Sequence, residues 1–333
     1  MGSHCHAFLL QRRHRHRPDG RPLLRNPHRA AAVKTLRDIG EDALIDRLTR
    51  LVPRDPDPAA GPGDDCAVID PGPVSAELQL LKTDAMVAGV HFLPDTPPRA
   101  VGWKAAARVV SDFAAMGGKP GRFLVTLALP PETSVSWAEE LYRGIGDCLA
   151  AFGAVLAGGE TSRVPPGSAA VISIAATGSV RREHLALRST ACPGQTLLVT
   201  GTLGGSLAGK HLNFTPRAKE AYWLVSEFKP TAMMDLSDGL AKDLPRLAVA
   251  SGCGCVLDHA ALPLSPGCTA AQALNDGEDF ELLLAIELER VPGLLAAWAT
   301  AFPSLPLTAI GHLVPAGSGE TLTGGWDHFS KLG

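Results

Sequence analysis

The sequence predicts an α+β protein with two domains, and three observations lead to this prediction. The chain has 333 residues, which is enough for two units with cores of their own. Short apolar runs of strand character alternate with longer stretches in which apolar residues recur at helical spacing. A charged, loop-like stretch at about 181–193 separates two such series. We therefore expect an extension at 1–35, an N-terminal domain at 36–185 and a C-terminal α/β domain at 186–333.

The elements expected in the N-terminal domain follow the order β-β-α-β-α-β-β after a first helix. That first helix is predicted over 36–51, where leucines and other apolar residues recur at helical spacing. The helix that follows the first two strands is predicted to stop at Gly117-Gly118, because glycine commonly ends a helix. The helices are expected at 99–116 and 135–152, and the strands at 67–69, 78–83, 122–129, 155–157 and 169–180.

The C-terminal domain is predicted to begin with a strand at 196–200. Further strands are expected at 233–235, 255–257, 280–286 and 308–310, and helices at 218–228, 239–250 and 291–301. The segment from Gly204 to Lys210 has the glycine and lysine spacing of a P-loop. It departs from that motif at His211, where a Ser or Thr should reach Mg2+. A P-loop is therefore the less favoured interpretation of this segment.

The charge of the chain is unevenly distributed. Residues 1–34 hold eight Lys/Arg and one Asp, a local charge of +7, whereas the other 299 residues hold 23 basic and 33 acidic side chains, a charge of −10. The basic segment has no apolar periodicity and is predicted to be disordered. A nucleic-acid-binding arm and a histidine metal tract are the alternatives, but Phe8 is its only aromatic residue for base stacking.

Composition also indicates the cellular compartment and excludes some classes of binding partner. Hydrophobic content of 45% is typical of a globular enzyme, and no apolar run approaches the about 18 residues of a membrane span. The seven cysteines are odd in number and scattered, without a CxxC motif, so free thiols in a reducing compartment are expected. We predict a cytoplasmic protein with neither a nucleic-acid nor a membrane partner.

Six short acidic clusters are the most informative feature for function. Each lies beside Gly, Ser or Thr, and most follow an apolar run. A carboxylate buried without a partner costs several kcal/mol, so such carboxylates are usually paired or bind a metal. Oxygen ligands without clustered His or Cys favour a hard cation such as Mg2+, which usually accompanies phosphate. The clusters are Gly63-Asp64-Asp65, Thr83-Asp84, Ser111-Asp112, Gly158-Gly159-Glu160-Thr161, Asp235-Leu236-Ser237-Asp238-Gly239 and Gly277-Glu278-Asp279.

The cluster from Asp235 to Gly239 is the strongest single signal. A predicted strand ends at Asp235, and a predicted helix begins at Gly239. Backbone N–H groups at a helix N-terminus, together with Ser237, suit a phosphate. The alternative for Asp238 alone is an ordinary helix N-cap, and any single cluster of the six could be only a turn.

Taken together and in order, these motifs resemble the thiamine-monophosphate kinases, a family of the ATP-binding superfamily of aminoimidazole ribonucleotide synthetase. The resemblance covers about residues 36–329, and its combination of elements is much more specific than any one alone. The motifs are Gly63-Asp64-Asp65-Cys66-Ala67-Val68, Thr83-Asp84, Gly89-Val90-His91-Phe92, Ser111-Asp112-Phe113-Ala114-Ala115-Met116-Gly117, Gly158-Gly159-Glu160-Thr161, Asp235-Leu236-Ser237-Asp238-Gly239-Leu240, Gly277-Glu278-Asp279-Phe280-Glu281-Leu282 and Trp326-Asp327-His328-Phe329.

The resemblance implies a two-domain aminoimidazole ribonucleotide synthetase-like fold, a homodimer, and transfer of the γ-phosphoryl group of ATP to thiamine monophosphate. The N-terminal domain would bind ATP and several Mg2+ ions. Matched to the family motifs, the Mg2+ ligands would be Asp65, Thr83, Asp84, Asp112, Glu160, Asp235 and Asp238. ATP would contact Gly159, Glu160, Arg188 and Ser237, and the substrate would contact His91, Glu278 and Trp326.

The chemistry of this reaction agrees with the residues present. The attacking atom is a phosphate oxygen that is already anionic at neutral pH, so we expect no dedicated general base. Catalysis then depends on positioning and on cations that neutralise two approaching anions. The alternatives are another ATP-dependent enzyme of the superfamily, or a non-catalytic nucleotide-binding protein with a decayed metal site.

The chain departs from the family pattern at three positions. Lys82 stands where the family commonly has a small hydroxyl residue near a metal, and Val109 stands where an Asn is usual. Glu160 replaces the usual Asp of the GGDT motif, as it does in the related synthetases with GGET. We expect Lys82 either to substitute its ammonium group for one cation or to point away from the site.

Overall fold

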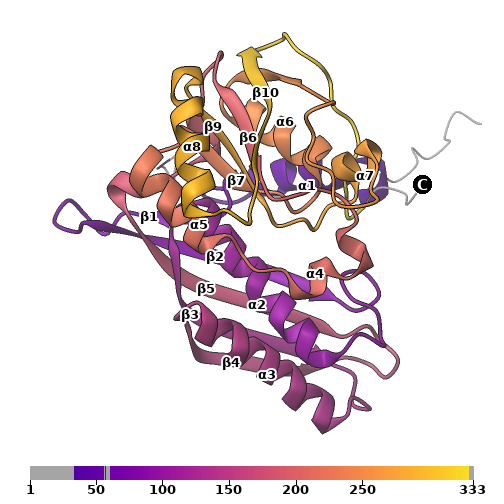
Figure 1. Cartoon of the computed structure of the whole chain (residues 1–333). Coiled ribbons are helices and arrows are strands. Elements are labelled where there is room, and N and C mark those ends of the chain that lie inside the picture. Colours follow the sequence, from indigo (N-terminus) through magenta and orange to yellow (C-terminus); the bar gives the residue numbers. More distant parts are fainter. Residues whose placement is uncertain (1–33, 56, 58–60, 330–333) are drawn as a thin grey trace, which may run out of the picture.

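The computed structural model describes residues 34–55, 57 and 61–329, and the predicted disordered extension therefore lies almost wholly outside the described residues. Two five-stranded sheets organise the described chain (Figure 1). The first is built from strands between residues 67 and 181, and the second from strands between 196 and 315. The predicted α+β class is confirmed.

The first sheet has the strand order β1-β2-β5-β3-β4. Its members are β1 (Ala67–Ile69), β2 (Glu77–Val87), β3 (Lys119–Leu129), β4 (Val155–Arg163) and β5 (Val171–Arg181). Neighbouring strands are antiparallel except for β3 and β4, which are parallel. Side chains alternate between the two faces of a strand, and here one face is buried while the other exposes residues such as Leu81 and Leu124.

Two helices cover the buried face of this sheet: α2 (Pro98–Ala115) and α3 (Val135–Ala151). They cross closely because each has glycine at the contact. A Cβ atom on Gly102 would lie 1.9 Å from the carbonyl oxygen of Leu141, and one on Gly144 would lie 1.9 Å from that of Arg99. The close crossing packs the apolar faces of both helices onto the sheet, and Val109 lies fully buried in this core.

The second sheet is antiparallel throughout, in the order β7-β9-β6-β10-β8. Its strands are β6 (Thr196–Thr200), β7 (Ala232–Asp235), β8 (Cys253–Leu257), β9 (Leu282–Ile286) and β10 (Leu307–Pro315). Every residue of β6, β7 and β9 is buried, because helices cover both faces of the sheet. On one face lies α6 (Leu240–Ala250), and on the other lie α8 (Val291–Ala301) and α5 (Ala218–Trp223), which continues as a π-helical turn, Leu224–Phe228.

Helix α2 connects the two halves of the molecule. Its C-terminal residues Ala114 and Ala115 belong to the core formed by β9, α5 and α8. One turn earlier, the Ser111 hydroxyl donates a hydrogen bond to Asp235 at the end of β7. A functional residue on this helix can therefore act together with residues of both sheets.

Several elements differ from the sequence prediction. The first helix, α1 (Gly40–Thr49), is shorter than expected and has no fully buried residue; ion pairs such as Glu41 with Lys242 hold it against α6. Strand β4 continues through the acidic motif to Arg163. A short helix α7 (Ala270–Asn275) was not predicted, and α4 is a single turn, Lys210–Asn213. Across the described ranges, every helix is too short or too polar to cross a membrane.

Candidate active site

Three carboxylates from distant parts of the chain meet at one buried point. Asp65 precedes β1, Asp112 lies on α2 and Asp235 ends β7. Each offers a carboxylate oxygen within 4.8 Å of the others, and all three residues are buried. We call this group the carboxylate cluster. Three of the predicted metal ligands are therefore neighbours in space.

Two cationic side chains border the carboxylate cluster. Lys82, on β2, places Nζ 2.8 Å from Oδ1 of Asp112. Arg188 forms an ion pair with Asp65 through Nη2, and its Nε donates a 3.3 Å hydrogen bond to Oδ2 of the same residue. Its backbone N–H also points at Asp64. The cluster thus retains more negative charge than these partners neutralise.

The pKa values of the carboxyl groups reflect this excess. Burial, together with the charge of Asp65, raises the pKa of Asp235 to about 7. Burial and Asp65 also raise the pKa of Asp64 to about 7. Burial raises the pKa of Asp112 well above its usual range, although Lys82 opposes this rise. Within the cluster, the pKa values of Asp112 and Asp235 are therefore raised. Three carboxylate oxygen ligands side by side suit a hard divalent cation, which would stabilise their negative charges.

A row of charged residues runs along α2 from the carboxylate cluster. Asp112, Arg108 and Lys104 are spaced four residues apart, so they lie on one face of the helix. Each has its own partner. Asp112 pairs with Lys82, Arg108 pairs with Asp84, and Lys104 pairs with Glu278. The row leads from the cluster to a pocket at the other end.

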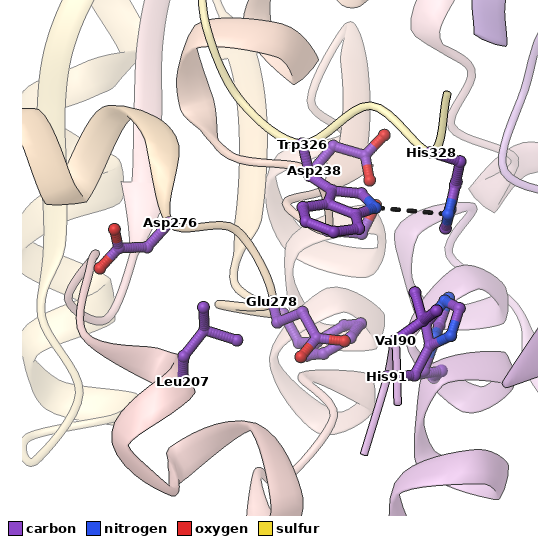
Figure 2. Close-up of a pocket in the computed structure, with 11 residues that line it drawn as sticks. Val90, His91, Leu207, Asp238, Asp276, Glu278, Trp326 and His328 are labelled. Atoms are coloured by element: carbon purple, nitrogen blue, oxygen red, sulfur yellow. Dashed lines mark hydrogen bonds between the residues drawn. The ribbon is translucent and has the colours of Figure 1, made fainter. Parts of the chain in front are cut away.

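The pocket lies between the turn after β2, the start of α6 and the C-terminal segment (Figure 2). In this view Trp326 and His328 lie on one side, and His91 and Glu278 on the other. All three predicted substrate residues therefore face one cavity. The lining residues are Val90, His91, Arg108, Leu207, Ser237, Asp238, Asp276, Glu278, Phe280, Trp326 and His328.

The floor of the pocket is a buried polar network. Lys104 is fully buried, and its Nζ donates hydrogen bonds to the His91 carbonyl and to Glu278 at 2.7 Å each. His211 Nδ1 lies 2.8 Å from the same Glu278 oxygen. Although burial opposes ionisation, the hydrogen bond from His211 and the charge of Lys104 lower the pKa of Glu278 to about 2. Burial, reinforced by the charge of Arg108, lowers the pKa of His91 to about 4. Glu278 is therefore a carboxylate and His91 a neutral imidazole at neutral pH.

Backbone geometry holds Glu278 in place. Its φ angle is +54°, in the left-handed region that side-chain-bearing residues rarely adopt. Gly277 before it has φ +69°, and a Cβ there would lie 2.9 Å from the Ser237 carbonyl oxygen. Hydrogen bonds from Glu278 N–H to that oxygen and from Phe280 N–H to the Leu236 carbonyl hold the turn. The acidic motif at 277–279 thus serves to point one carboxylate into the pocket.

The segment after β7 brings two more predicted residues to the pocket, Ser237 and Asp238. Asp238 pairs with Lys242 and Arg246 of α6 at 3.2 and 2.7 Å. Its carbonyl accepts a hydrogen bond from the Trp326 N–H at 2.8 Å. Asp238 therefore lies on the pocket wall and outside the carboxylate cluster.

The structure does not bring every predicted ligand together. Thr83 alternates with Asp84 on β2, so its side chain lies on the exposed face of the sheet, opposite α2. Gly159 and Glu160 lie on β4, whose residues are all exposed. The register joins Ala85 to Ser173, Ser173 to Thr126, and Thr126 to Glu160. Glu160 is thus three strands, roughly 14 Å, from β2.

Sequence reasoning missed Lys104, Arg108, His211 and His328. The spacing of Lys104, Arg108 and Asp112 along a helix was a signal for the first two. Contacts with Glu278 and Lys104 bring His211 to the pocket floor, which no local pattern indicated. Lys210, from the P-loop-like segment, lies 3.1 Å from the buried Glu281 and 3.1 Å from the Thr202 carbonyl, and is not a lining residue of the pocket.

Comparison with known proteins first defines the class. Residues 63–180 match the family model described as AIR synthase related protein, N-terminal domain. A solved structure described as AaThiL complexed with AMPPCP and TMP aligns with a TM-score of 0.77 and 30% identity, covering 90% of this chain and all of that one. The matched segment and the structural alignment therefore give this chain an AIR synthase-related fold.

The sequence relatives define the family within that class. Thiamine-monophosphate kinase of Rhodopirellula baltica is 37% identical over 276 residues, which cover 78% of this chain and 84% of that protein. The Escherichia coli (strain K12) protein of the same name is 34% identical over 334 residues, covering 87% and 98%. The chain belongs to the thiamine-monophosphate kinase family, and the predicted resemblance is confirmed.

Proposed function

We propose that this protein transfers the γ-phosphoryl group of ATP to thiamine monophosphate by direct in-line attack, giving thiamine diphosphate and ADP. The observation that carries the proposal is the row along α2. It connects a pocket lined by Trp326, His91 and Glu278 to a buried carboxylate cluster suited to a cation. An acceptor held in the pocket by its ring system would point its phosphate along this row towards ATP.

The residues of the site bind the acceptor, Mg2+ and ATP, and the reaction needs no general base. The neutral His91 and the carboxylate of Glu278 hold an acceptor whose phosphate oxygen is already a nucleophile. Asp65, Asp112 and Asp235 would hold Mg2+, and Asp84 and Asp238 would extend that set when ATP is bound. When bound, Mg2+ neutralises the negative charge shared by the two phosphate groups. Arg188, which pairs with Asp65, and Ser237, two residues after Asp235, would contact ATP.

We also propose that the enzyme is a homodimer in which Glu160 acts on the site of a second copy. Within its own chain Glu160 lies three strands away from β2, on the exposed face of the sheet, opposite α2. The exposed face of the first sheet carries apolar side chains, with Leu81 38%, Leu124 48% and Leu156 47% exposed. A second copy packed on this face would cover them and bring Thr83, Gly159 and Glu160 to an interface.

Mixed dimers test this arrangement. Asp112→Asn and Glu160→Gln chains, each inactive alone, should regain activity when they are co-folded, because one site per mixed dimer then holds both native carboxylates. Absence of recovery in mixed dimers, or full activity of Glu160→Gln alone, contradicts a role of Glu160 across the interface. Leu124→Arg should shift the sedimentation coefficient to that of a monomer, while Val135→Arg, an exposed residue at the start of α3, should not.

The activity itself is tested by coupled ADP release with Mg2+ and ATP. Thiamine monophosphate should stimulate release, thiamine should not, and chromatography should show thiamine diphosphate as the product. ATP binding without any turnover would favour the non-catalytic alternative. Stimulation only by an unrelated acceptor would favour another enzyme of the superfamily. The six cysteines among the described residues are free thiols, which fits a reducing cytoplasm as the place of this reaction.

A further inference from the structure

Arg108 stands between the pocket and the carboxylate cluster. It lies one helical turn from Asp112 on one side and one turn from Lys104 on the other. Its side chain is among those that line the pocket, and it is 14% exposed. A substituent that runs from the pocket to the cluster must therefore pass this guanidinium group.

The hydrogen-bonding capacity of Arg108 is only partly used. Nη2 donates a 3.1 Å hydrogen bond to Oδ1 of Asp84, and Nε lies 2.9 Å from Oδ2 of Asp84 without the alignment of a hydrogen bond. Nη1 is buried and has no hydrogen-bond partner within the described part of the chain. Buried donors are rarely left in this state, because each loses its hydrogen bonds to water.

The other cations of the site differ from Arg108 in this respect. Lys104 has three polar neighbours, namely the His91 carbonyl, His211 and Glu278. Lys82 is paired with Asp112, and Arg188 with Asp65. Arg108 is thus the pocket-lining cation that keeps free donors, and a guanidinium group binds a phosphate through two parallel hydrogen bonds.

We propose that Arg108 binds the phosphate group of the monophosphate acceptor and turns it towards the carboxylate cluster. The inference rests on the proposed function and deepens it, because it assigns a residue that distinguishes a phosphorylated acceptor from its unphosphorylated form. Arg108 binds the group that carries the nucleophile. Glu278, His91 and Trp326 bind the ring system that both forms share.

Arg108→Met tests the inference in the full-length enzyme. We compare KM for thiamine monophosphate with the inhibition constant of thiamine, which has the same rings without the phosphate. The variant should raise KM for thiamine monophosphate roughly 10- to 100-fold, the loss expected for hydrogen bonds to a charged group, and leave the thiamine constant close to wild type. Arg108→Lys, which keeps the charge without the paired donors, should recover part of the loss.

Arg99→Met is the matched control, because Arg99 lies on the same helix and pairs with the exposed Asp147 away from the pocket. It should change neither constant. If Arg108 only supports Asp84, Arg108→Met will lower the melting temperature or raise KM for ATP while the ratio of the two acceptor constants stays unchanged, and the inference is wrong. Wild-type enzyme without turnover of thiamine monophosphate would instead overturn the proposed function, and this inference with it.

Discussion

Lys82 and Asp112 form an ion pair at the edge of the carboxylate cluster, with Nζ 2.8 Å from Oδ1. Both side chains are largely buried, at 22% and 11% exposure. Although burial opposes it, the charge of Asp112 raises the pKa of Lys82, so the ammonium group stays protonated. Of the two orientations that the sequence left open, the structure shows Lys82 directed at the cluster. A protein cation therefore pairs with one carboxylate oxygen of the cluster.

Replacing Lys82 should change how many divalent ions the protein binds. In Lys82→Ser the carboxylate of Asp112 loses its partner, so a further cation is needed to balance its charge. We expect Mn2+ titration followed by electron paramagnetic resonance to show a larger number of bound ions than in wild type. The Mg2+ concentration that gives half-maximal rate should rise several-fold.

Lys119→Ser provides the control for this titration, since Lys119 forms an exposed ion pair with Glu77. Its Mn2+ binding curve should superimpose on that of wild type. If the Lys82→Ser curve superimposes as well, Lys82 does not replace a cation.

Asp112→Asn should nearly abolish turnover in a protein that still folds. The change removes one of the three converging oxygen ligands, and several phosphate oxygens then lose their cation. The loss of kcat should exceed the about 10²–10⁴-fold that removal of a general base typically causes. Circular dichroism and melting temperature should remain close to wild type. Asp147→Asn, at an exposed position on α3, serves as the control.

Much of the site could be predicted because its ligands follow recognisable element ends. Asp235 closes a buried strand, and Glu278 follows a glycine in a tight turn, so local sequence marks both. The helical period equally fixes Asp112 on α2. Other predicted ligands lie on the first sheet, and the face on which each of them lies could not be predicted without the strand order. Only the register shows that Thr83 and Glu160 lie on the exposed face, across β5 and β3 from each other.

The prediction of a buried first helix failed for a different reason. The leucines at helical spacing in 36–51 predicted an amphipathic helix with a buried face, yet Leu48 is 52% exposed. Charged contacts hold this helix instead, including Arg246 with Asp42. Apolar periodicity indicates which residues could form a core. Ion pairs between distant segments produce no periodic pattern in the sequence, so they cannot be predicted in this way. The missed Lys104 shows the same limit, because its partner Glu278 lies 174 residues further along the chain.

The stability of the metal-free protein should fall as pH rises from 6.5 to 8. Burial raises the pKa values of Asp64, Asp235 and Asp243 to about 7 from the usual 3.8. The folded state keeps these protons above pH 4, where the unfolded chain has lost them. Their contribution to the free energy of unfolding is therefore full below about pH 4 and is lost as pH rises through 7.

We expect the melting temperature in EDTA to be lower at pH 8 than at pH 6.5 by at least roughly 2 °C, the shift that corresponds to about 1 kcal/mol in a chain of this size. Mg2+ should raise it more at pH 8, because it binds the ionised carboxylates. Sodium chloride at matched ionic strength is the control. Equal melting temperatures at both pH values, or an equal effect of sodium chloride, would contradict this account of the buried carboxyl groups.

Trp326 should determine how tightly the acceptor's ring system binds. Its indole lines the pocket, whereas its backbone is held independently, with the N–H donating to the Asp238 carbonyl and its own carbonyl accepting from Lys242. Removing the side chain therefore leaves the segment in place. Thiamine carries a cationic thiazolium ring, and an indole face attracts such a cation by about 0.5–2 kcal/mol, more when water is excluded.

Trp326→Ala should thus raise KM for thiamine monophosphate and the inhibition constant of thiamine together, by about 2- to 30-fold. KM for ATP and the melting temperature should stay close to wild type. Trp298→Ala is the contrasting variant, because Trp298 is 2% exposed within the core and donates its indole N–H to the Leu305 carbonyl. That variant should lose about 3–5 kcal/mol of stability. If Trp326→Ala behaves like Trp298→Ala, losing stability with unchanged acceptor constants, its indole belongs to the core and the acceptor's rings bind elsewhere.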